Sequence, residues 1–386
     1  MVFPFLLLLP SLSAGLASAP PPAPAAQSDP TLERAQALLA AGKPEQAVPA
    51  FELVVAARPG NAAALAGLAA AYAAVGDPHT EETYERAMAA DRKNLPLRVA
   101  YAEYLWQARR YDKGNAEMEK VIRAAPGNPK LKAHYGVNLA EQGRFAQAVA
   151  ELDAARRQGM DNADVLFYLG SALWEVGRLE EAQDQLRQAV LRAPEKVAAR
   201  HRLGRLLLFR GRPAEAAAEL SLAARLVPDS AEIALDFGRA LEATGQTTEA
   251  EATYRKALEL EPGLSVTHYA LGTLLARAGR REEAQGHIAL YRDYFQKEQE
   301  RRFRAGSRQA ELNLGLTQLD AGRVEEALAQ FSRRPDDAEA LQGAAAALSK
   351  LGRHAEAVRA LERALLIDPD NRALRYALDR EREKTK

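Results

Sequence analysis

Glycine recurs at a fixed 34-residue interval through the middle of this chain, and no other feature limits the possible folds as strongly. Three columns of residues keep this interval over five copies: turn glycines, alanines five positions later, and a second set of glycines seven positions earlier. Their members are Gly143, Gly177, Gly211, Gly245 and Gly279; Ala148, Ala182, Ala216, Ala250 and Ala284; and Gly136, Gly170, Gly204, Gly238 and Gly272. Columns in a shared register indicate a repeat protein built from one supersecondary unit.

Each unit contains two stretches with helical spacing. In one copy, residues 166–173 and residues 182–189 both place apolar side chains at helical intervals, so each stretch has one apolar face. Gly177 lies between them, where glycine can adopt the left-handed conformation that ends a helix. Pro194 ends the second helix because it has no N–H. Polar residues such as Ser230 follow the equivalent proline, and we predict that they cap the next helix.

The earlier glycine column and the alanine column are predicted to face each other within a unit. Small residues at both positions would let the two helices approach closely. A larger side chain at Gly204, or a charged one at Ala216, should therefore destabilise the array.

The unit resembles the tetratricopeptide repeat, whose pattern is Trp-x2-Leu-Gly-x2-Tyr, then Ala-x3-Phe, then Pro. The corresponding residues here include His268-x2-Leu271-Gly272-x2-Leu275, Ala250-x3-Tyr254 and Pro262. The resemblance implies an all-α fold, a right-handed α-solenoid of about ten helix-turn-helix repeats. It also implies a non-enzymatic scaffold that binds a peptide or protein in a concave groove lined by the first helices.

The repeat register divides the sequence into segments. We expect a signal peptide over 1–19, an Ala/Pro linker over 20–30 and eight repeats over 28–298. The eight repeats are 28–61, 62–94, 95–128, 129–162, 163–196, 197–230, 231–264 and 265–298. A helical extension over 297–307 follows, then two further repeats within 308–371 (308–337 and 338–371) and a charged capping helix over 372–386.

Residues 1–19 have the pattern of a secretory signal peptide, with an apolar run from Val2 to Leu9 and the small residues Ala17-Ser18-Ala19. No basic residue precedes that run and Pro20 follows it, so an uncleaved N-terminal membrane anchor is the alternative. No later apolar run reaches the roughly 20 residues needed to cross a bilayer. We therefore expect a periplasmic or secreted protein with no transmembrane segment after the signal peptide.

The pattern changes after Ala284. No proline ends the second helix of this repeat, and Ala305-Gly306-Ser307 is the first helix-breaking sequence. We predict a long helix that ends there and offsets the repeats that follow. The cluster from Arg301 to Arg304 is interpreted as a charged helix surface, with contact to anionic lipid or to another subunit as alternatives. Self-association through residues 282–304 is a further hypothesis.

Composition argues against several classes of function. The sequence has 52 basic and 52 acidic residues, and this balance argues against a dedicated nucleic-acid binder, which would carry a basic excess. The absence of cysteine excludes disulfides and thiol catalysis.

Catalytic sequence patterns are missing as well. The sequence has no Gly-x-Ser-x-Gly elbow, no phosphate-binding glycine loop and no His-Glu-x-x-His. The six histidines are interpreted as lying in different repeats, so no metal site is predicted. Acidic pairs such as Glu180-Glu181 lie in the first turn of second helices, where carboxylates interact favourably with the helix dipole. We predict no catalytic residue, no cofactor and no enzymatic activity.

The resemblance implies which residues line the groove, because the family presents fixed positions of each first helix to its ligand. Trp and Arg at such positions often contribute roughly 2 kcal/mol or more each to binding. Arg205, Arg239 and Arg277 could form a basic rail for an acidic or C-terminal peptide, or they could be ordinary solvated charges; the two tryptophans could instead belong to the core. The predicted partner-binding residues are Trp106, Phe167, Trp174, His201, Arg205, Phe209, Arg239, Tyr269 and Arg277.

The family analogy also suggests a setting for an exported scaffold of this kind, namely envelope assembly or secretion. The alternative is a structural or regulatory subunit of an envelope polysaccharide-export or glycosyltransferase complex. A cytoplasmic adaptor with an atypical start is the third hypothesis. The sequence does not identify the partner.

Overall fold

A computed structural model describes residues 29–385, so the predicted signal peptide lies outside the described residues. Within this range the protein forms twenty α-helices and no strand, which confirms the all-α fold. The helices are α1 (Pro30–Ala40), α2 (Pro44–Ala57), α3 (Ala62–Val75), α4 (Thr80–Ala90), α5 (Leu95–Gln107), α6 (Tyr111–Ala124), α7 (Pro129–Glu141), α8 (Phe145–Arg157), α9 (Ala163–Glu175), α10 (Leu179–Arg192), α11 (Val197–Phe209), α12 (Pro213–Leu226), α13 (Ala231–Ala243), α14 (Thr247–Leu260), α15 (Ser265–Arg277), α16 (Arg281–Asp320), α17 (Val324–Phe331), α18 (Ala338–Lys350), α19 (His354–Ile367) and α20 (Arg372–Lys384).

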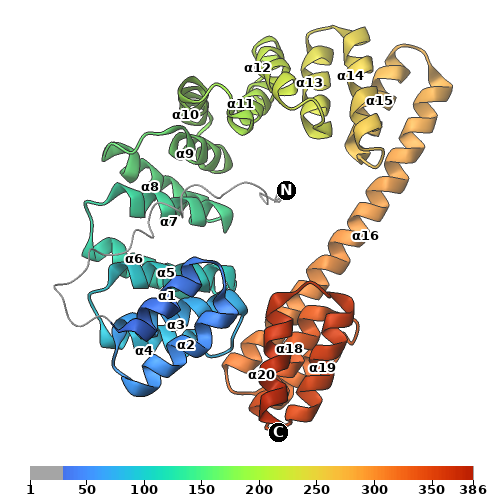
Figure 1. The fold of residues 1–386 in the computed structure, drawn as a ribbon. Coiled ribbons are helices and arrows are strands. Elements are labelled where there is room, and N and C mark those ends of the chain that lie inside the picture. The colour runs from blue at the N-terminus through green and yellow to red at the C-terminus, as the bar shows by residue number, and fades with distance from the viewer. Residues whose placement is uncertain (1–28, 386) are drawn as a thin grey trace. The chain divides into compact units, whose positions relative to one another are not determined.

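The helices pack in consecutive antiparallel pairs, and each pair stacks on the next, as in an α-solenoid (Figure 1). Two compact units result, and each is described by itself. The first comprises residues 122–302, and the second combines residues 29–121 with residues 303–385. In the first unit, α7 contacts α9, α9 contacts α11 and α11 contacts α13, so the first helices of successive repeats lie side by side. Side-by-side first helices are expected on the inner side of a curved stack.

The turn between the two helices of a repeat is set by local backbone chemistry. Gly177 and Gly211 have φ angles of 82° and 69°, which confirms the predicted left-handed conformation after the first helix. In the repeat 95–128 the equivalent residue is Arg109, and it has the same conformation with φ of 58°. A non-glycine residue there costs roughly 1–2 kcal/mol, because its Cβ crowds the following carbonyl oxygen.

The predicted N-caps are present. The Ser230 hydroxyl accepts a hydrogen bond from the N–H of Ile233 at 3.3 Å, and the Asn371 side chain accepts from the N–H of Leu374 at 3.2 Å. Both bonds satisfy a backbone donor that has no partner inside its helix.

The inner glycine column faces a different residue from the one that we predicted. A Cβ at Gly204 would lie 2.5 Å from Cγ of Leu220, four residues after Ala216, and a Cβ at Gly238 would lie 2.6 Å from Cε1 of Tyr254. The alanine side chains do not face the glycines directly; at Gly170 the nearby group is instead the carbonyl oxygen of Ala182, at 3.1 Å. The glycines therefore accommodate a large side chain of the second helix, not a small one.

The structure also corrects the predicted end of the long helix. Residues Arg281–Asp320 form one helix of 40 residues that continues through Ala305, Gly306 and Ser307. Gly306 has no other atom near the position of a Cβ, so nothing around it imposes a turn. A single glycine in a helix costs only about 1 kcal/mol, and helical residues on both sides outweigh this cost.

In the second unit, the C-terminal helix packs beside the N-terminal repeats. The Tyr376 hydroxyl on α20 donates to Oδ2 of Asp77 at 3.2 Å, and Arg380 lies 3.2 Å from Glu52. Arg110 forms a further ion pair of 3.4 Å with Asp320 at the end of α16. The predicted role of α20 as a cap agrees with its apolar residues Leu374 and Leu378, which are buried.

Candidate protein-binding site

The strongest concentration of exposed aromatic and basic side chains lies on the first helices of the first unit, α9, α11, α13 and α15. These helices are neighbours, so residues at equivalent positions form one surface across several repeats. Their local formation follows from the apolar spacing and from the N-caps described above.

Trp174 is the aromatic centre of this surface. The guanidinium carbon of Arg202 lies 4.1 Å from the centroid of its ring, and that of Arg205 lies 5.8 Å away. Phe209 on α11 is 6.3 Å from Trp174 between ring centroids, and its side chain is 67% exposed. Arg202 is buried beneath the indole and donates to Glu175. Burial lowers the pKa of the Arg202 guanidinium below its ordinary value, although the bond to Glu175 opposes this shift.

A buried carboxylate lies next to this aromatic centre. Asp236 on α13 accepts a hydrogen bond from Nε2 of His201 at 2.8 Å and another from Nη1 of Arg239 at 3.0 Å. Nε of Arg205 lies 3.5 Å from the same carboxylate. Burial alone would raise the pKa of Asp236, but the hydrogen bond from His201 and the charges of His201, Arg205 and Arg239 outweigh it, and the pKa lies below its ordinary value. The carboxylate therefore stays ionised and holds two arginines and a histidine in position.

The basic surface continues to the next repeat. Nη1 of Arg277 donates to Glu242 at 2.6 Å, yet the Arg277 side chain is 71% exposed. Glu242 also accepts a hydrogen bond of 2.8 Å from the buried Tyr254 hydroxyl, so it is held in place from below. Burial raises the pKa of Tyr254 well above its ordinary value, and the phenol remains a donor. Tyr269 completes this part of the surface and is half exposed.

The structure does not place every predicted residue on this surface. Trp106 lies in the second unit, is only 6% exposed, and donates through Nε1 to Asn115 at 2.8 Å. Gly114 leaves room for this indole, because a Cβ there would lie 2.6 Å from Trp106. Phe167 is 5% exposed, with Lys196 over its ring. Trp106 and Phe167 are therefore core residues, and the remaining seven predicted residues lie together on α9, α11, α13 and α15 or at the ends of these helices.

Sequence reasoning missed two residues that organise the site. Arg202 and Asp236 occupy the sixth position of successive repeats, and both are buried. The available signal was a charged residue at a position surrounded by apolar ones. A buried charge requires a partner, and this requirement alone would have directed attention to Trp174, Glu175 and His201.

The interpretation that the histidines lie in different repeats is wrong for one pair. His268 and His287 belong to the same repeat, and their Nδ1 atoms lie 2.9 Å apart. Nε2 of His268 donates to the carbonyl of Pro262 at 3.0 Å, so its Nδ1 is the acceptor for His287. Burial lowers the pKa of His287 below its ordinary value, and His268 adds to this effect. Across residues 29–385 no three His, Cys, Asp or Glu residues come close enough to hold a metal ion.

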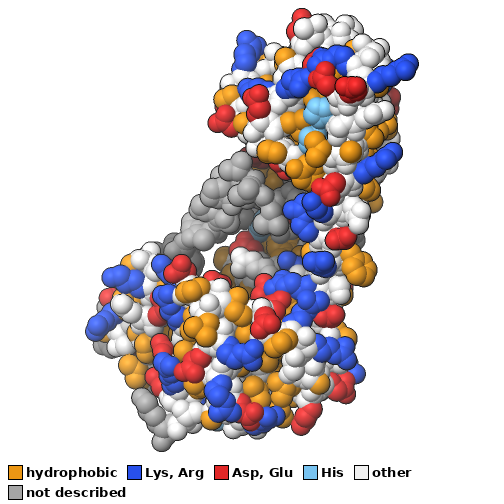
Figure 2. Space-filling view, turned by 90° about the vertical axis from the view of Figure 1, so that its right-hand side faces the viewer, with side chains coloured by type: hydrophobic (Ala, Val, Ile, Leu, Met, Phe, Trp, Pro, Cys, Tyr) orange, Lys and Arg blue, Asp and Glu red, His pale blue; other side chains and the backbone are white. Residues whose placement is uncertain are grey.

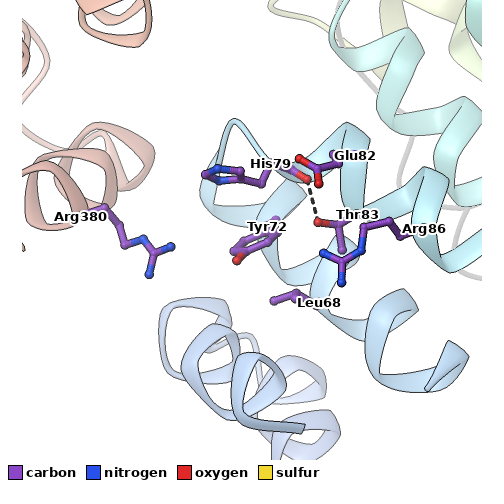
Figure 3. Close-up of a pocket in the computed structure, with 7 residues that line it drawn as sticks. All are labelled: Leu68, Tyr72, His79, Glu82, Thr83, Arg86 and Arg380. Carbon is purple, nitrogen blue, oxygen red and sulfur yellow. Dashed lines mark hydrogen bonds between the residues drawn. The ribbon is translucent and has the colours of Figure 1, made fainter. Parts of the chain in front are cut away.

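A small hollow in the second unit is a weaker candidate. It has a volume of about 160 Å³ and is lined by polar side chains that include Tyr72, His79, Arg86 and Arg380 (Figure 3). Ligand pockets usually have volumes of about 300–1,000 Å³ and a largely apolar lining. His79 is already bonded to Asp77 at 2.8 Å, and this bond raises the pKa of His79 above its ordinary value. The hollow is therefore too small and too polar for a typical organic ligand.

Paired helices, left-handed turns and an exposed first-helix surface define a helix-turn-helix repeat protein of the interaction-scaffold class. Tetratricopeptide repeat models match residues 38–78, 105–169, 167–231, 201–265, 265–289, 308–333 and 338–371. The protein belongs to the tetratricopeptide repeat family. Members of this family are generally non-catalytic, and the match supports a scaffold for protein–protein interaction.

Several solved tetratricopeptide proteins share part of this architecture. MamA from Desulfovibrio magneticus RS-1 is 21% identical, with a TM-score of 0.42, over 44% of this chain and 96% of its own. YrrB, described as a TPR protein with an unusual peptide-binding site, is 19% identical, with a TM-score of 0.44, over 49% of this chain and 98% of its own. No curated protein sequence matches this one. Between residues 29 and 385, no helix is both long enough and apolar enough to span a membrane.

Proposed function

We propose that this protein is a non-enzymatic scaffold that binds a protein or peptide across α9, α11 and α13. The observation that carries the proposal is the exposed Phe209 beside Trp174, with arginines held next to both rings by the buried Asp236. Aromatic residues and arginines are the side chains that most often dominate binding energy at protein interfaces.

The site favours a partner segment that combines a carboxylate with an apolar side chain. A guanidinium has five N–H donors, so Arg239 and Arg277 keep donors for a partner while they bond to Asp236 and Glu242. Both arginines are exposed enough to reach a bound segment, at 41% and 71% of the side chain. Phe209 and Trp174 offer an apolar surface next to these charges. An acidic segment, or the C-terminus of a partner protein, meets both requirements.

The setting that we propose is the cell envelope, where the protein would act in assembly or secretion as a periplasmic or secreted protein. Support comes from the sequence pattern of residues 1–19 and from the family analogy. A subunit of an envelope polysaccharide-export or glycosyltransferase complex is the alternative, as is attachment through an uncleaved N-terminus. N-terminal sequencing of the protein recovered from cell fractions tests export: a mature protein that still begins at Met1 in the cytosol would contradict it.

Crosslinking pull-down from the native host tests the binding surface. We expect Phe209→Ala combined with Arg277→Glu to reduce recovery of the partner at least tenfold, since about 1.4 kcal/mol already corresponds to a factor of ten. The matched control is Leu366→Ala combined with Arg157→Glu, because these residues are 82% and 74% exposed and lie elsewhere. Equal recovery with both double variants would remove the surface from consideration and leave the fold intact.

A further inference from the structure

The regular stacking of repeats is interrupted between repeat 265–298 and repeat 308–337. Elsewhere a turn separates each second helix from the next first helix, and the two pack on each other. Here the second helix of one repeat and the first helix of the next are parts of the continuous helix α16. Residues 308–320 therefore do not turn back along residues 281–298, and each repeat keeps one uncovered face.

The downstream face of repeat 265–298 is aromatic. Position 27 of a regular repeat is a small residue that the next repeat covers completely, as at Ala189, Ala223 and Ala257. In this repeat the position holds Tyr291, which is only partly buried. The Tyr291 ring lies 5.2 Å from Tyr269 and 5.5 Å from Phe295 between centroids. Figure 2 views the molecule from the side of α15 and α16, where hydrophobic side chains lie uncovered among charged ones.

The upstream face of repeat 308–337 is apolar as well. Position 7 of a first helix is buried wherever a preceding repeat packs on it, as at Leu169, Leu203 and Leu271. At the true start of the array, where no repeat precedes, this position holds the exposed Arg34. In repeat 308–337 it holds Leu314, which is 47% exposed. Ala310 and Thr317, at positions 3 and 10, are exposed too, although these positions are mostly buried in the other repeats.

The residue types indicate that this face is covered in solution. An open end of a repeat array normally carries polar residues, because exposed apolar surface there costs free energy. Arg34 follows this rule and Leu314 does not. Size also matches across the two open faces, since the large Tyr291 belongs to one and the small Ala310 and Thr317 to the other.

We propose that a second copy of this protein covers both faces. Repeat 308–337 of each copy stacks on repeat 265–298 of the other, and the reciprocal exchange gives a closed two-fold dimer. The continuity of α16 favours exchange between copies over closure within one copy. Each seam then restores the order of repeats that the sequence encodes, with Leu314 of one copy against Tyr291 of the other.

Two exposed leucines on the same helix provide a matched pair of variants. Leu314 is 47% exposed and Leu316 is 46% exposed, but Leu316 is not at a position buried by stacking. Light scattering of the full-length protein should give twice the mass of one copy for the wild type and for Leu316→Asp, and the mass of one copy for Leu314→Asp. A monomeric wild type would overturn the proposal, and so would equal behaviour of the two variants.

Thiol crosslinking identifies the faces that meet, because the protein has no cysteine of its own. Tyr291→Cys and Leu314→Cys are prepared as separate variants, mixed under conditions that exchange subunits, and treated with a short bismaleimide. We expect a covalent dimer from this mixture and none from Tyr291→Cys mixed with Leu316→Cys.

Three results would overturn the proposal. The first is a covalent dimer of Tyr291→Cys alone, which would show that the aromatic faces meet each other. The second is an internal crosslink in a protein that carries both Tyr291→Cys and Leu314→Cys, which would show closure within one copy. The third is the absence of any crosslink in the mixture, with a wild-type mass of one copy.

Discussion

Replacing Gly204 by alanine tests the close approach of α11 and α12 most directly. A Cβ at Gly204 would lie 2.5 Å from Cγ and 2.9 Å from Cδ2 of Leu220. Leu220 is fully buried, and Cγ is not the mobile end of its side chain, so the clash cannot be relieved by a simple rotation. Overpacking of this kind costs roughly 1–3 kcal/mol. Alanine regains about 1 kcal/mol of helix propensity, so we expect a net loss of about 1 kcal/mol.

Gly286 provides the matched control for this substitution. It also lies inside a helix, α16, but no atom lies within 4 Å of the position of its Cβ. Gly286→Ala should therefore stabilise its helix by about 1 kcal/mol from propensity alone. The two substitutions make the same chemical change and are expected to have opposite signs.

Hydrogen exchange followed by mass spectrometry suits this comparison, since repeat arrays need not unfold in one cooperative step. Exchange of α11 and α12 should accelerate in Gly204→Ala, and exchange of the first turns of α16 should slow in Gly286→Ala. In the background Leu220→Ala, which itself costs about 2–5 kcal/mol, Gly204→Ala should become stabilising because the obstructing side chain is gone. Equal stabilisation by Gly204→Ala and Gly286→Ala in the wild-type background would refute the predicted packing.

Three further predictions follow from single residues. Arg109→Gly should stabilise the repeat 95–128 by about 1 kcal/mol, because glycine removes the strain of the left-handed conformation; a lower urea midpoint would contradict this. Ser230→Ala should cost about 1 kcal/mol through the lost N-cap bond to Ile233, seen as faster exchange in the first turn of α13, whereas Ser230→Asp should preserve the cap. The depressed pKa of Asp236 implies stability that is present above its unfolded value of 3.8 and lost as the pH falls below it through the folded pKa. Asp236→Asn should flatten the pH dependence of stability in that acid range, and an unchanged profile would show that the carboxylate is not stabilised by its partners.

Much of the repeat architecture was predictable because it depends on local chemistry. The turn at Gly177 needs only a residue that tolerates a positive φ, and the cap at Ser230 needs only an oxygen three residues before the N–H that it accepts from. Helical apolar spacing likewise indicated the paired helices from neighbouring residues alone. Position in the repeat also brought seven of the nine predicted site residues to one surface.

The rest depended on contacts between residues far apart in the sequence. Whether α16 ends at Gly306 depends on what packs on either side, since the cost of one helical glycine is small. Whether an aromatic residue belongs to the core or to the surface depends on its neighbours, so Trp106 bonds to Asn115 in the core whereas Phe209 is exposed. The Asp236 cluster joins α11 to α13, and the 34-residue period carries no information about which charges meet across that seam. Periodicity therefore determined the repeating unit, and tertiary packing decided which of its surfaces are covered, because burial and charge pairing are properties of the assembled stack.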